Sequence, residues 1–391
     1  MQQKKIGLNT ICTHVGEVKD EQFKGAVSPL YMSSSYAFED VDVKRYPRYF
    51  NTPNQEALCK KIAALEHAEA GLIFGSGMAA ITTSLMAFLR AGDHVVLQQV
   101  LYGGTYNLVM EEFDKFGIEY SFTHGWAPED FEKKIRSNTK VIYIETPSNP
   151  LLTITDLDAI GKLAKKHGLI SMIDNTFASP VNQNPIDFGI DVVIHSATKY
   201  MGGHSDILAG AVASSEENIN RIFALAKNFG GSLSDYTVWL LERSLKTMGL
   251  RVKAQNANAQ HMAEYLFGHK AVTRVYYPGL KSHPDYELAK SQMNGFGGML
   301  SFELHEDYDA TQFQKELQLI KPSMSLAGVE STMLSPTKTS HALLGAEERA
   351  KQGILDGLIR FSVGIEEPED LIADIEQALE KVRLGRVATT S

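Results

Sequence analysis

The stretch from Ala70 to Ala213 alternates short apolar runs with amphipathic segments. This alternation is typical of βαβ units, because parallel strands need a crossover connection, which is usually a helix. The runs with the length and composition of strands are AGLIF, HVVLQQ, EYSFT, VIYIET, LISMID, DVVIHS and AGAVAS. We therefore predict an α/β domain on a mostly parallel sheet, with its ligand site beyond the carboxyl ends of the strands.

The rest of the chain indicates a second domain and an N-terminal arm. Residues 239–267 predict one long helix that leaves the large domain. The later runs TRVYYP, GGMLSFEL and LIRFSVGI, followed by the helical stretch 370–385, indicate a smaller α+β domain. The residues before Ala57 are polar, punctuated by proline and without periodicity. The predicted parts are an arm over 1–56 that contacts a neighbouring subunit, a large domain over 57–245 and a small domain over 246–391.

The composition argues against several classes of protein. No apolar run reaches the roughly 18 residues of a membrane span, and the N-terminus lacks the apolar core of a secretory signal. We therefore expect a soluble, cytoplasmic protein with no membrane partner. A net charge of −9 without a block of Lys and Arg argues against nucleic acid. Cys12 and Cys59 alone form neither a disulfide framework nor a metal cluster, so no metal is expected. The tail from Arg386 is expected to fray.

The segment SATKYMGGHSD, which contains Lys199, follows the apolar run DVVI. Most lysines are solvated surface cations. A lysine between Thr198 and Tyr200 at a strand end is poorly placed for solvation, and desolvation lowers the pKa of an ammonium group towards useful nucleophilicity. The hydroxyls of Ser196 and Thr198 are close to it in sequence. We predict a reactive Lys199 accompanied by hydroxyls that bind an anionic oxygen.

Two further motifs precede Lys199. LISMID ends at Asp174, which either caps the following turn or pairs with a protonated pyridinium nitrogen. LIFGSGM places Gly75, Ser76 and Gly77 before a helix, which makes either an ordinary turn or a phosphate site built from N–H groups at the helix start. Along the chain these motifs come in the order helix start, Asp, Ser-x-Thr-Lys. In this order they suit three parts of pyridoxal 5′-phosphate (PLP): its phosphate, its ring nitrogen and its aldehyde.

Five longer motifs occur in order along the chain: ETPSNP, IDNTFASP, HSATKYMGGHSD, YPGLKSHPDYELAKSQMNGFGGMLSFEL and IRFSVGIEE. With them the chain resembles, over nearly its whole length, the Cys/Met metabolism family of PLP-dependent enzymes. That family includes cystathionine γ-lyases, β-lyases and γ-synthases, methionine γ-lyases and O-acylhomoserine sulfhydrylases. The resemblance implies the fold of type I PLP enzymes, with a large domain like that of aspartate aminotransferase and a smaller C-terminal domain.

The resemblance also implies roles for individual residues. Lys199 matches the lysine that holds PLP as a Schiff base and carries protons, and Asp174 matches the partner of the ring nitrogen. Tyr102 matches the aromatic residue that stacks on the ring and acts as acid or base near the leaving group, aided by Tyr46. The other groups implied to bind the cofactor are the N–H groups of Gly77 and Met78, the hydroxyls of Ser196 and Thr198, and Tyr46 and Arg48 from the neighbouring subunit. The substrate is implied to bind at Asn149 and Arg360, which hold its α-carboxylate, and at Ser325.

The chain departs from the family pattern at three places. After Arg48, the residues 50–53 make the loop one residue longer than the usual spacing. Met324 precedes Ser325, where γ-synthases and many γ-lyases carry Glu. Met324 therefore either lines the pocket at the distal end of the substrate or fills a gap in the core. Gly104 stands where methionine γ-lyases commonly carry a reactive cysteine, which argues against that subtype.

We interpret the chain as a PLP-dependent carbon–sulfur lyase of sulfur amino-acid metabolism. Like cystathionine γ- or β-lyases, it would release a thiol, a keto acid and ammonia by elimination. One alternative is a γ-replacement transferase, such as a cystathionine γ-synthase or an O-acylhomoserine sulfhydrylase, which shares the residues named above. A remote alternative is a non-catalytic, PLP-binding regulatory protein. The resemblance implies a homotetramer assembled from dimers that share active sites.

Overall fold

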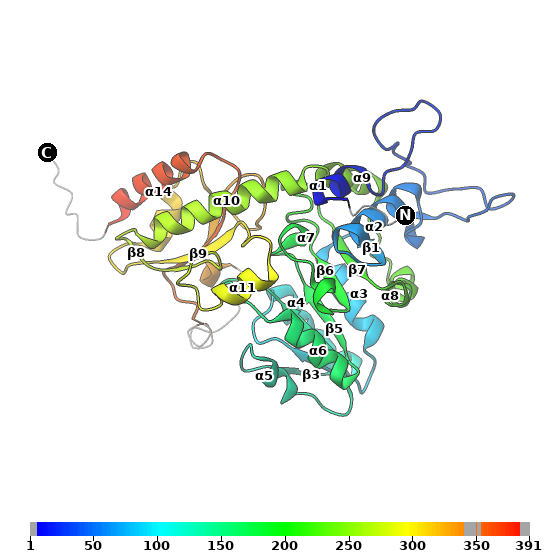
Figure 1. Ribbon diagram of the computed structural model, residues 1–391, viewed down its shortest axis with the longest axis horizontal. Helices are drawn as coiled ribbons and strands as arrows, with labels where there is room; N and C mark the ends of the chain where they lie inside the picture. The colour runs from blue at the N-terminus through cyan, green and yellow to red at the C-terminus, as the bar shows by residue number, and fades with distance from the viewer. Residues whose placement is uncertain (1–5, 340–348, 350–352, 384–391) are drawn as a thin grey trace. The chain divides into compact units, whose positions relative to one another are not determined.

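The computed structural model describes residues 6–339, 349 and 353–383, which form two compact units (Figure 1). The first unit comprises the residues up to Thr146 together with Thr155–Leu250, and the second comprises Pro147–Ile154 and the residues from Arg251 onwards. The predicted tail from Arg386 lies outside the described residues.

The segment Pro147–Ile154 differs from the predicted boundaries, which place it in the large domain. Its backbone is bonded to the second unit: Ser301 Oγ donates to Pro150 O at 2.8 Å, and Ile154 N donates to Asp285 Oδ2 at 3.0 Å. These contacts join residues more than a hundred positions apart, so sequence periodicity carries no sign of them.

The first unit is built on a seven-stranded sheet with the order β1-β7-β6-β5-β4-β2-β3. Its strands are β1 (Ala70–Phe74), β2 (His94–Leu97), β3 (Glu119–Phe122), β4 (Thr139–Glu145), β5 (Ile170–Asp174), β6 (Val192–His195) and β7 (Gly210–Ser214). Neighbouring strands are parallel, except that β7 is antiparallel to both β1 and β6. The predicted α/β class with a mostly parallel sheet is confirmed, and every predicted run in this unit forms a strand.

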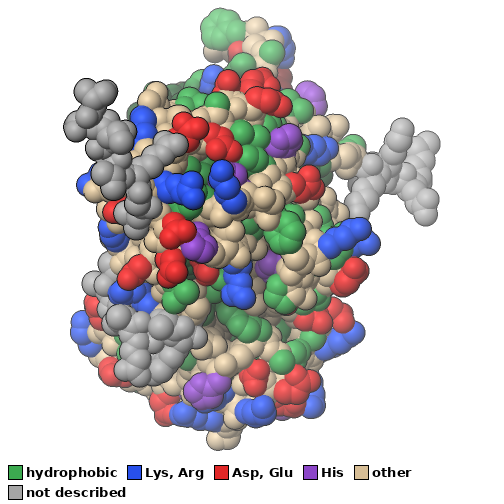
Figure 2. All heavy atoms as spheres, turned by 90° about the vertical axis from the view of Figure 1, so that its left-hand side faces the viewer, with side chains coloured by type: hydrophobic (Ala, Val, Ile, Leu, Met, Phe, Trp, Pro, Cys, Tyr) green, Lys and Arg blue, Asp and Glu red, His purple; other side chains and the backbone are tan. Residues whose placement is uncertain are grey.

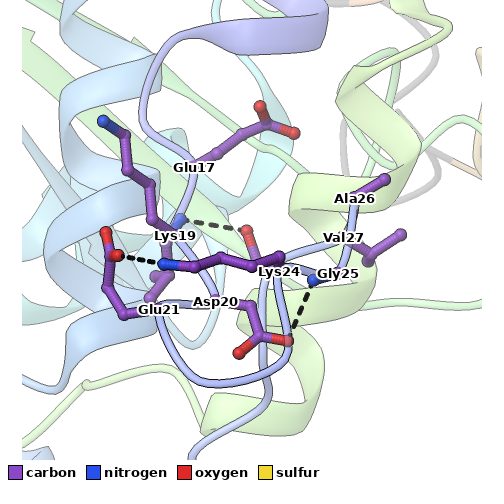
Figure 3. A pocket seen from close by; sticks show the side chains of 10 residues that line it. Glu17, Lys19, Asp20, Glu21, Lys24, Gly25, Ala26 and Val27 are labelled. Carbon is purple, nitrogen blue, oxygen red and sulfur yellow. Dashed lines mark hydrogen bonds and ion pairs between the residues drawn. The ribbon is translucent and has the colours of Figure 1, made fainter.

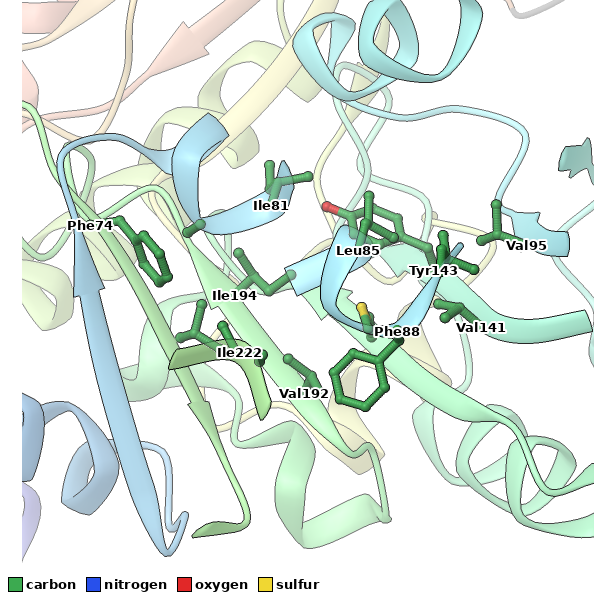
Figure 4. Close-up of a cluster of buried hydrophobic side chains, with 14 of the residues drawn as sticks. Phe74, Ile81, Leu85, Phe88, Val95, Val141, Tyr143, Val192, Ile194 and Ile222 are labelled. Carbon is green, nitrogen blue, oxygen red and sulfur yellow. The ribbon is translucent and has the colours of Figure 1, made fainter. Parts of the chain in front are cut away.

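Helices cover both faces of this sheet. One face packs on α3 (Gly77–Phe88) and α8 (Glu216–Phe229), and part of the resulting cluster of buried side chains is drawn in Figure 4. The other face packs on α5 (Pro128–Glu132) and α6 (Leu157–His167). Because both faces are buried, a slip of one residue would turn every side chain of a strand to the wrong face. The core therefore fixes which residue ends each strand at the carboxyl edge.

The first unit contains further helical segments. They are α1 (Leu8–His14), η1 (Pro47–Tyr49), α2 (Pro53–Leu65), α4 (Gly103–Glu112), η2 (Phe113–Phe116), α7 (Ser179–Asn182), η3 (Pro185–Phe188) and α9 (Asp235–Leu245).

The single long helix predicted over 239–267 is wrong. Two helices occupy this stretch, α9 and α10 (Met248–Phe267). Between them, the N–H groups of Lys246 and Thr247 each bond to the carbonyl three residues earlier, at 3.3 Å. Bonds of this spacing tighten the backbone into a 3₁₀-type turn and end the first helix. An amphipathic pattern continues through such a turn, so it did not reveal the break.

The N-terminal arm has little regular structure and exposes several large apolar side chains, among them Phe23, Met32 and Phe38. It is tied to α2 by the buried Lys61, whose Nζ donates to Cys12 O at 2.7 Å. The loop Glu17–Ser28 surrounds a cavity in which its own charged groups bond to one another and to its backbone (Figure 3). The loop is also bonded to α9 and to the turn that follows it, because Ser28 Oγ donates to Glu242 Oε1 at 2.9 Å and Lys246 Nζ donates to Glu17 Oε1 at 2.5 Å. None of the predicted site residues lines this cavity.

The second unit contains a five-stranded sheet with the order β10-β11-β12-β9-β8. Its strands are β8 (Val272–Tyr276), β9 (Met299–Leu304), β10 (Lys321–Pro322), β11 (Thr332–Leu334) and β12 (Leu358–Ser362). Its helical segments besides α10 are α11 (Tyr286–Gln292), α12 (Ala310–Glu316), η4 (Pro336–Lys338) and α14 (Pro368–Val382). Three strands follow predicted runs. The strands β10 and β11, which are two and three residues long, are too short to give a periodic signal.

The face of the molecule in Figure 2 carries acidic and basic side chains side by side, without a block of either sign. No helix among the described residues is both long and apolar enough to cross a membrane. The same residues contain no group of His, Cys, Asp and Glu side chains fit to hold a metal ion.

Candidate active site

Lys199 lies in the turn that follows β6, at the carboxyl edge of the large sheet. Its N–H donates to Ser196 O at 3.1 Å, and its carbonyl accepts from Gly203 N at 2.7 Å. The main chain of the turn therefore positions the residue, and its side chain is half-buried. This edge is where open α/β sheets place their ligands.

Asp174 is the last residue of β5 and pairs in register with Ile194 of β6. Its carboxylate is buried, and Oδ1 accepts a hydrogen bond from Thr176 N at 3.0 Å. Burial raises the pKa of Asp174, although hydrogen bonds from Thr176 and the nearby charges of His195 and Lys199 oppose the rise. A buried carboxylate of this kind is stabilised by a cation placed against it, as a protonated ring nitrogen would be.

The start of α3 lies directly against Ser196. A side chain at Gly77 would bring its Cβ to 2.8 Å from Ser196 Cβ, so only glycine allows the helix to approach this closely. Ser76 caps the helix by accepting from Ala79 N at 3.0 Å. Within the described part of the chain, the N–H groups of Gly77 and Met78 make no hydrogen bond. Two free donors at the positive end of a helix form an anion site beside Ser196.

The hydroxyl of Thr198, which is also predicted to bind the phosphate, forms hydrogen bonds with the backbone of Ala209. Oγ1 accepts from Ala209 N at 3.0 Å and donates to Ala209 O at 3.2 Å. Donation of this hydroxyl to a phosphate would require it to leave the Ala209 carbonyl.

Tyr102 precedes α4, and 46% of its surface is exposed. Its N–H donates to Glu145 Oε2 at 2.7 Å, and Glu145 is the cross-strand neighbour of Asp174. A Cβ on Gly104 would lie 2.5 Å from Cε1 of the Tyr102 ring and 2.9 Å from Met78 Sδ. The ring therefore lies over the first turn of α4 beside Met78, and in this conformation Gly104 leaves no room for the cysteine of methionine γ-lyases.

A separate group of predicted residues lies in the second unit, around Arg360 of β12. The guanidinium donates to Asn149 Oδ1 at 3.2 Å and to Ser325 O at 2.8 Å. Burial lowers the pKa of Arg360 to about 10, so the group still carries its charge at neutral pH. Ser325 has a positive φ of 84°, a strained conformation for a residue with a side chain. A buried guanidinium beside an amide suits a carboxylate.

Met324 is 73% exposed, so the interpretation of this residue as gap-filling core is wrong. It contributes to a cavity of about 210 Å³ within the second unit, together with Met333, Leu334 and Lys338. The side chain is available to a ligand.

Arg48 contacts its own chain away from Lys199. Its guanidinium donates to Lys227 O at 2.5 Å and lies 4.8 Å from the ring centroid of Tyr49. In the described part of the chain, none of its contacts is with the groups around Lys199. Within this loop Phe50 has a packing role, because it is buried with edge-to-face contacts to Phe74 and Phe223.

Residues 9–380 match the model of the family described as Cys/Met metabolism PLP-dependent enzyme. The chain belongs to this family. The predicted resemblance is therefore confirmed, and the protein is a PLP-dependent enzyme.

Relatives of the chain cover almost its whole length. A cystathionine γ-lyase of Bacillus subtilis is 45% identical over 377 residues, which is 95% of this chain and 99% of the relative. A cystathionine β-lyase of Lactococcus lactis subsp. cremoris is 44% identical over 94% of this chain and 97% of its own. The crystal structure of cystathionine γ-lyase from Lactobacillus plantarum complexed with L-serine superposes with a TM-score of 0.93 at 40% identity, covering 96% and 99% of the two chains.

The residues of the first unit fit the PLP of this family. The two free N–H groups of α3 suit its phosphate, and the close approach that Gly77 permits brings Ser196 to the same place. The buried Asp174 suits its ring nitrogen, and Lys199 suits its aldehyde. All of these groups lie at one edge of the sheet.

The sequence interpretation missed residues that support this site. Thr176 donates its N–H to Asp174 and accepts from Ser196 N at 2.8 Å through Oγ1, so it links two predicted cofactor residues. Its place two residues after Asp174 was a usable signal. Glu145, which anchors the N–H of Tyr102, lies in ETPSNP but had no predicted role.

Proposed function

We propose that the enzyme is a carbon–sulfur lyase that cleaves cystathionine by elimination. The observation that carries the proposal is the near-full-length similarity, at 44–45% identity, to two cystathionine lyases, together with the cluster around Lys199. The γ-replacement transferases of the family use the same groups, so the assignment to a lyase depends on the products.

Lys199 has the place of the proton carrier. When bound, PLP stabilises the negative charge that develops at Cα of an amino acid joined to it. The Lys199 amine would take the Cα proton and, for γ-elimination, would afterwards take a proton from Cβ. Asp174 holds positive charge at the ring nitrogen, and Tyr102, aided by Tyr46, protonates the departing sulfur. Ser196, Gly77 and Met78 bind the phosphate.

The substrate carboxylate is proposed to bind at Arg360. Two parallel N–H bonds from a guanidinium match the two oxygens of a carboxylate, and Asn149 orients the group through its Oδ1. The backbone at Ser325 supplies the second anchor of Arg360. Met324, next to Ser325, is proposed to face the distal end of the substrate.

We propose a homotetramer of dimers in which Tyr46 and Arg48 complete the partner's site. The exposed apolar side chains of the arm support an interface there. The cytoplasmic location, and the absence of nucleic-acid and membrane partners, are predictions from composition.

The product analysis tests the proposed reaction. Purified enzyme is incubated with cystathionine, homocysteine, methionine, cysteine and acylhomoserines, and keto acid, thiol and ammonia are measured. From cystathionine, γ-elimination gives cysteine and 2-oxobutyrate, whereas β-elimination gives homocysteine and pyruvate. Formation of cystathionine from an acylhomoserine and cysteine, without keto acid from cystathionine itself, would show a transferase instead.

Mixed oligomers test the shared site. Subunits with Arg48→Ala are co-assembled with subunits with Lys199→Ala, and each mixed dimer then holds one site with both an intact Lys199 and an intact partner Arg48. We expect each parent to be weakly active or inactive and the mixture to regain activity. Verified mixed dimers that recover no activity would indicate that Arg48 acts within its own chain or not at all.

Met324→Glu is expected to favour cystathionine over homocysteine. A carboxylate at this position would bind the distal ammonium of cystathionine, and one such charge-assisted bond changes the kcat/KM ratio by roughly 10- to 100-fold. Because Met324 is exposed, the substitution buries no charge and Tm should change little. Leu355→Glu, at another exposed apolar residue of this unit, is the control. An unchanged ratio in a stable Met324→Glu enzyme would remove Met324 from the specificity pocket.

A further inference from the structure

We propose that Glu66 is a positioning residue that holds the cofactor-binding ends of β5 and β6 in place. Glu66 follows α2, far from Lys199 in sequence, and its side chain is fully buried. Its carboxylate accepts hydrogen bonds from three side chains: His195 Nε2 at 2.5 Å, Asn175 Nδ2 at 3.0 Å and Asn184 Nδ2 at 3.5 Å. The inference rests on the proposed roles of Asp174 and Ser196.

Two of these donors are the immediate neighbours of proposed cofactor residues. Asn175 follows Asp174 at the end of β5, and His195 precedes Ser196 at the end of β6. The side chains of Asn175 and His195 turn to Glu66, whereas Asp174 accepts from Thr176 N and Ser196 lies against Gly77 of α3. One carboxylate that holds both neighbours therefore sets the relative position of the cofactor-facing residues.

Thr176 links the ends of β5 and β6 through a second set of hydrogen bonds. Its N–H donates to Asp174 Oδ1 at 3.0 Å, and its Oγ1 accepts from Ser196 N at 2.8 Å. The backbone continues the ladder, because Asn175 N donates to Ile194 O at 2.9 Å. Asp174 and Ser196 are thus held from the Glu66 side and from the Thr176 side.

The donors of the network are set by its amides. Amide nitrogens only donate, so Glu66 is the acceptor for both asparagines, and its Oε1 also lies 2.5 Å from His195 Nε2. Gln183 fixes the amide of Asn175, because Gln183 Nε2 donates to Asn175 Oδ1 at 2.9 Å and Asn175 Nδ2 donates to Gln183 O at 3.0 Å. A buried carboxylate is costly unless such donors satisfy it, and a satisfied buried network makes its surroundings rigid.

A matched pair joins the same two strands at their other ends. Ser171 at the start of β5 donates from Oγ to Asp191 Oδ2 at 2.7 Å and accepts from Asp191 N at 3.0 Å. This pair also ties β5 to β6, but at the amino edge of the sheet. A substitution in this pair therefore distinguishes a general loss of stability from a specific effect on the cofactor site.

The test compares Glu66→Gln with Ser171→Ala in the full-length enzyme. Glutamine keeps the volume but turns an amide N–H₂ towards groups that also donate. Loss of an outer partner costs metal sites roughly 10- to 100-fold in affinity or activity, and we expect that range for PLP affinity and kcat here. PLP affinity is measured by equilibrium dialysis of the holoenzyme, with kcat, KM and Tm determined in parallel. Ser171→Ala should lower Tm while PLP affinity stays within about twofold of the wild type.

His195→Gln is the second variant, because glutamine retains a donor for Glu66 and should keep part of the affinity if Glu66→Gln fails to fold. Wild-type PLP affinity and kcat in a folded Glu66→Gln or His195→Gln enzyme would overturn the proposal, as would an equal loss of PLP affinity in Ser171→Ala. Lys199→Ala is carried in parallel. If Lys199→Ala leaves turnover and bound-cofactor absorbance unchanged, the site assignment and this proposal both fail. If Lys199→Ala is inactive but Glu66→Gln has wild-type PLP affinity and kcat, only this proposal is overturned.

Discussion

Lys199→Ala is expected to abolish cystathionine cleavage while the protein keeps its fold. The variant removes the amine proposed to carry the Cα proton, and general acid–base groups contribute about 10²- to 10⁴-fold to rate. Loss of the covalent anchor of the cofactor adds to this effect. The backbone bonds that position residue 199, to Ser196 O and from Gly203 N, do not involve the side chain, so alanine preserves them. Keto-acid release under steady-state conditions measures the loss.

The covalent anchor has its own readout. The wild-type holoenzyme should absorb visible light, and borohydride reduction followed by peptide mapping should fix the cofactor on the peptide that contains Lys199. Lys162→Ala is the control, since Lys162 is an exposed lysine paired with Asp158 on α6. Normal turnover in Lys199→Ala, or cofactor fixed on another peptide, would show that the anchor is elsewhere.

The large sheet could be predicted because its strands are buried on both faces and therefore appear as continuous apolar runs. Residue types mark the ends of α6 in the same way: an Asp, Asp156, caps it through Ala159 N at 3.0 Å, and a Gly, Gly168, ends it with a φ of 64°. The break between α9 and α10 was not predictable, because hydrogen bonds three residues back leave the amphipathic pattern intact.

Some residues of the candidate site could likewise be predicted from the sequence, and others could not. Lys199 and Asp174 follow apolar runs, so the position of each at a strand end could be read from the sequence, while the closeness of Gly77 to Ser196 depends on how α3 packs. The Glu66 network joins residues 109 to 129 positions apart, and no periodic signal marks either partner. Periodicity predicts the elements and their ends, whereas contacts between elements depend on tertiary packing.

The substitution Asp174→Asn distinguishes a role of Asp174 in binding the cofactor from a role in stabilising the fold. Burial raises the pKa of Asp174 in the folded protein, so folding disfavours the ionised form. Such a group stabilises the fold below its unfolded pKa and loses that contribution as the pH rises through the folded pKa. Near neutral pH, asparagine removes this penalty and can still accept from Thr176 N through its carbonyl oxygen. The Tm of the cofactor-free variant should therefore equal or exceed that of the cofactor-free wild type.

The same substitution should lower the PLP affinity and the kcat of the holoenzyme. A neutral amide cannot hold the positive charge of the ring nitrogen, and a hydrogen bond to a charged group is worth about 1.5 to 3 kcal/mol, or roughly 10- to 100-fold in PLP affinity. kcat should fall as well, because an unprotonated ring accepts electrons poorly. Tm is measured with and without PLP beside kcat and the PLP dissociation constant. If Asp174 only caps the turn, the cofactor-free variant will lose stability while PLP affinity and kcat remain at wild-type values, which would place the partner of the ring nitrogen elsewhere.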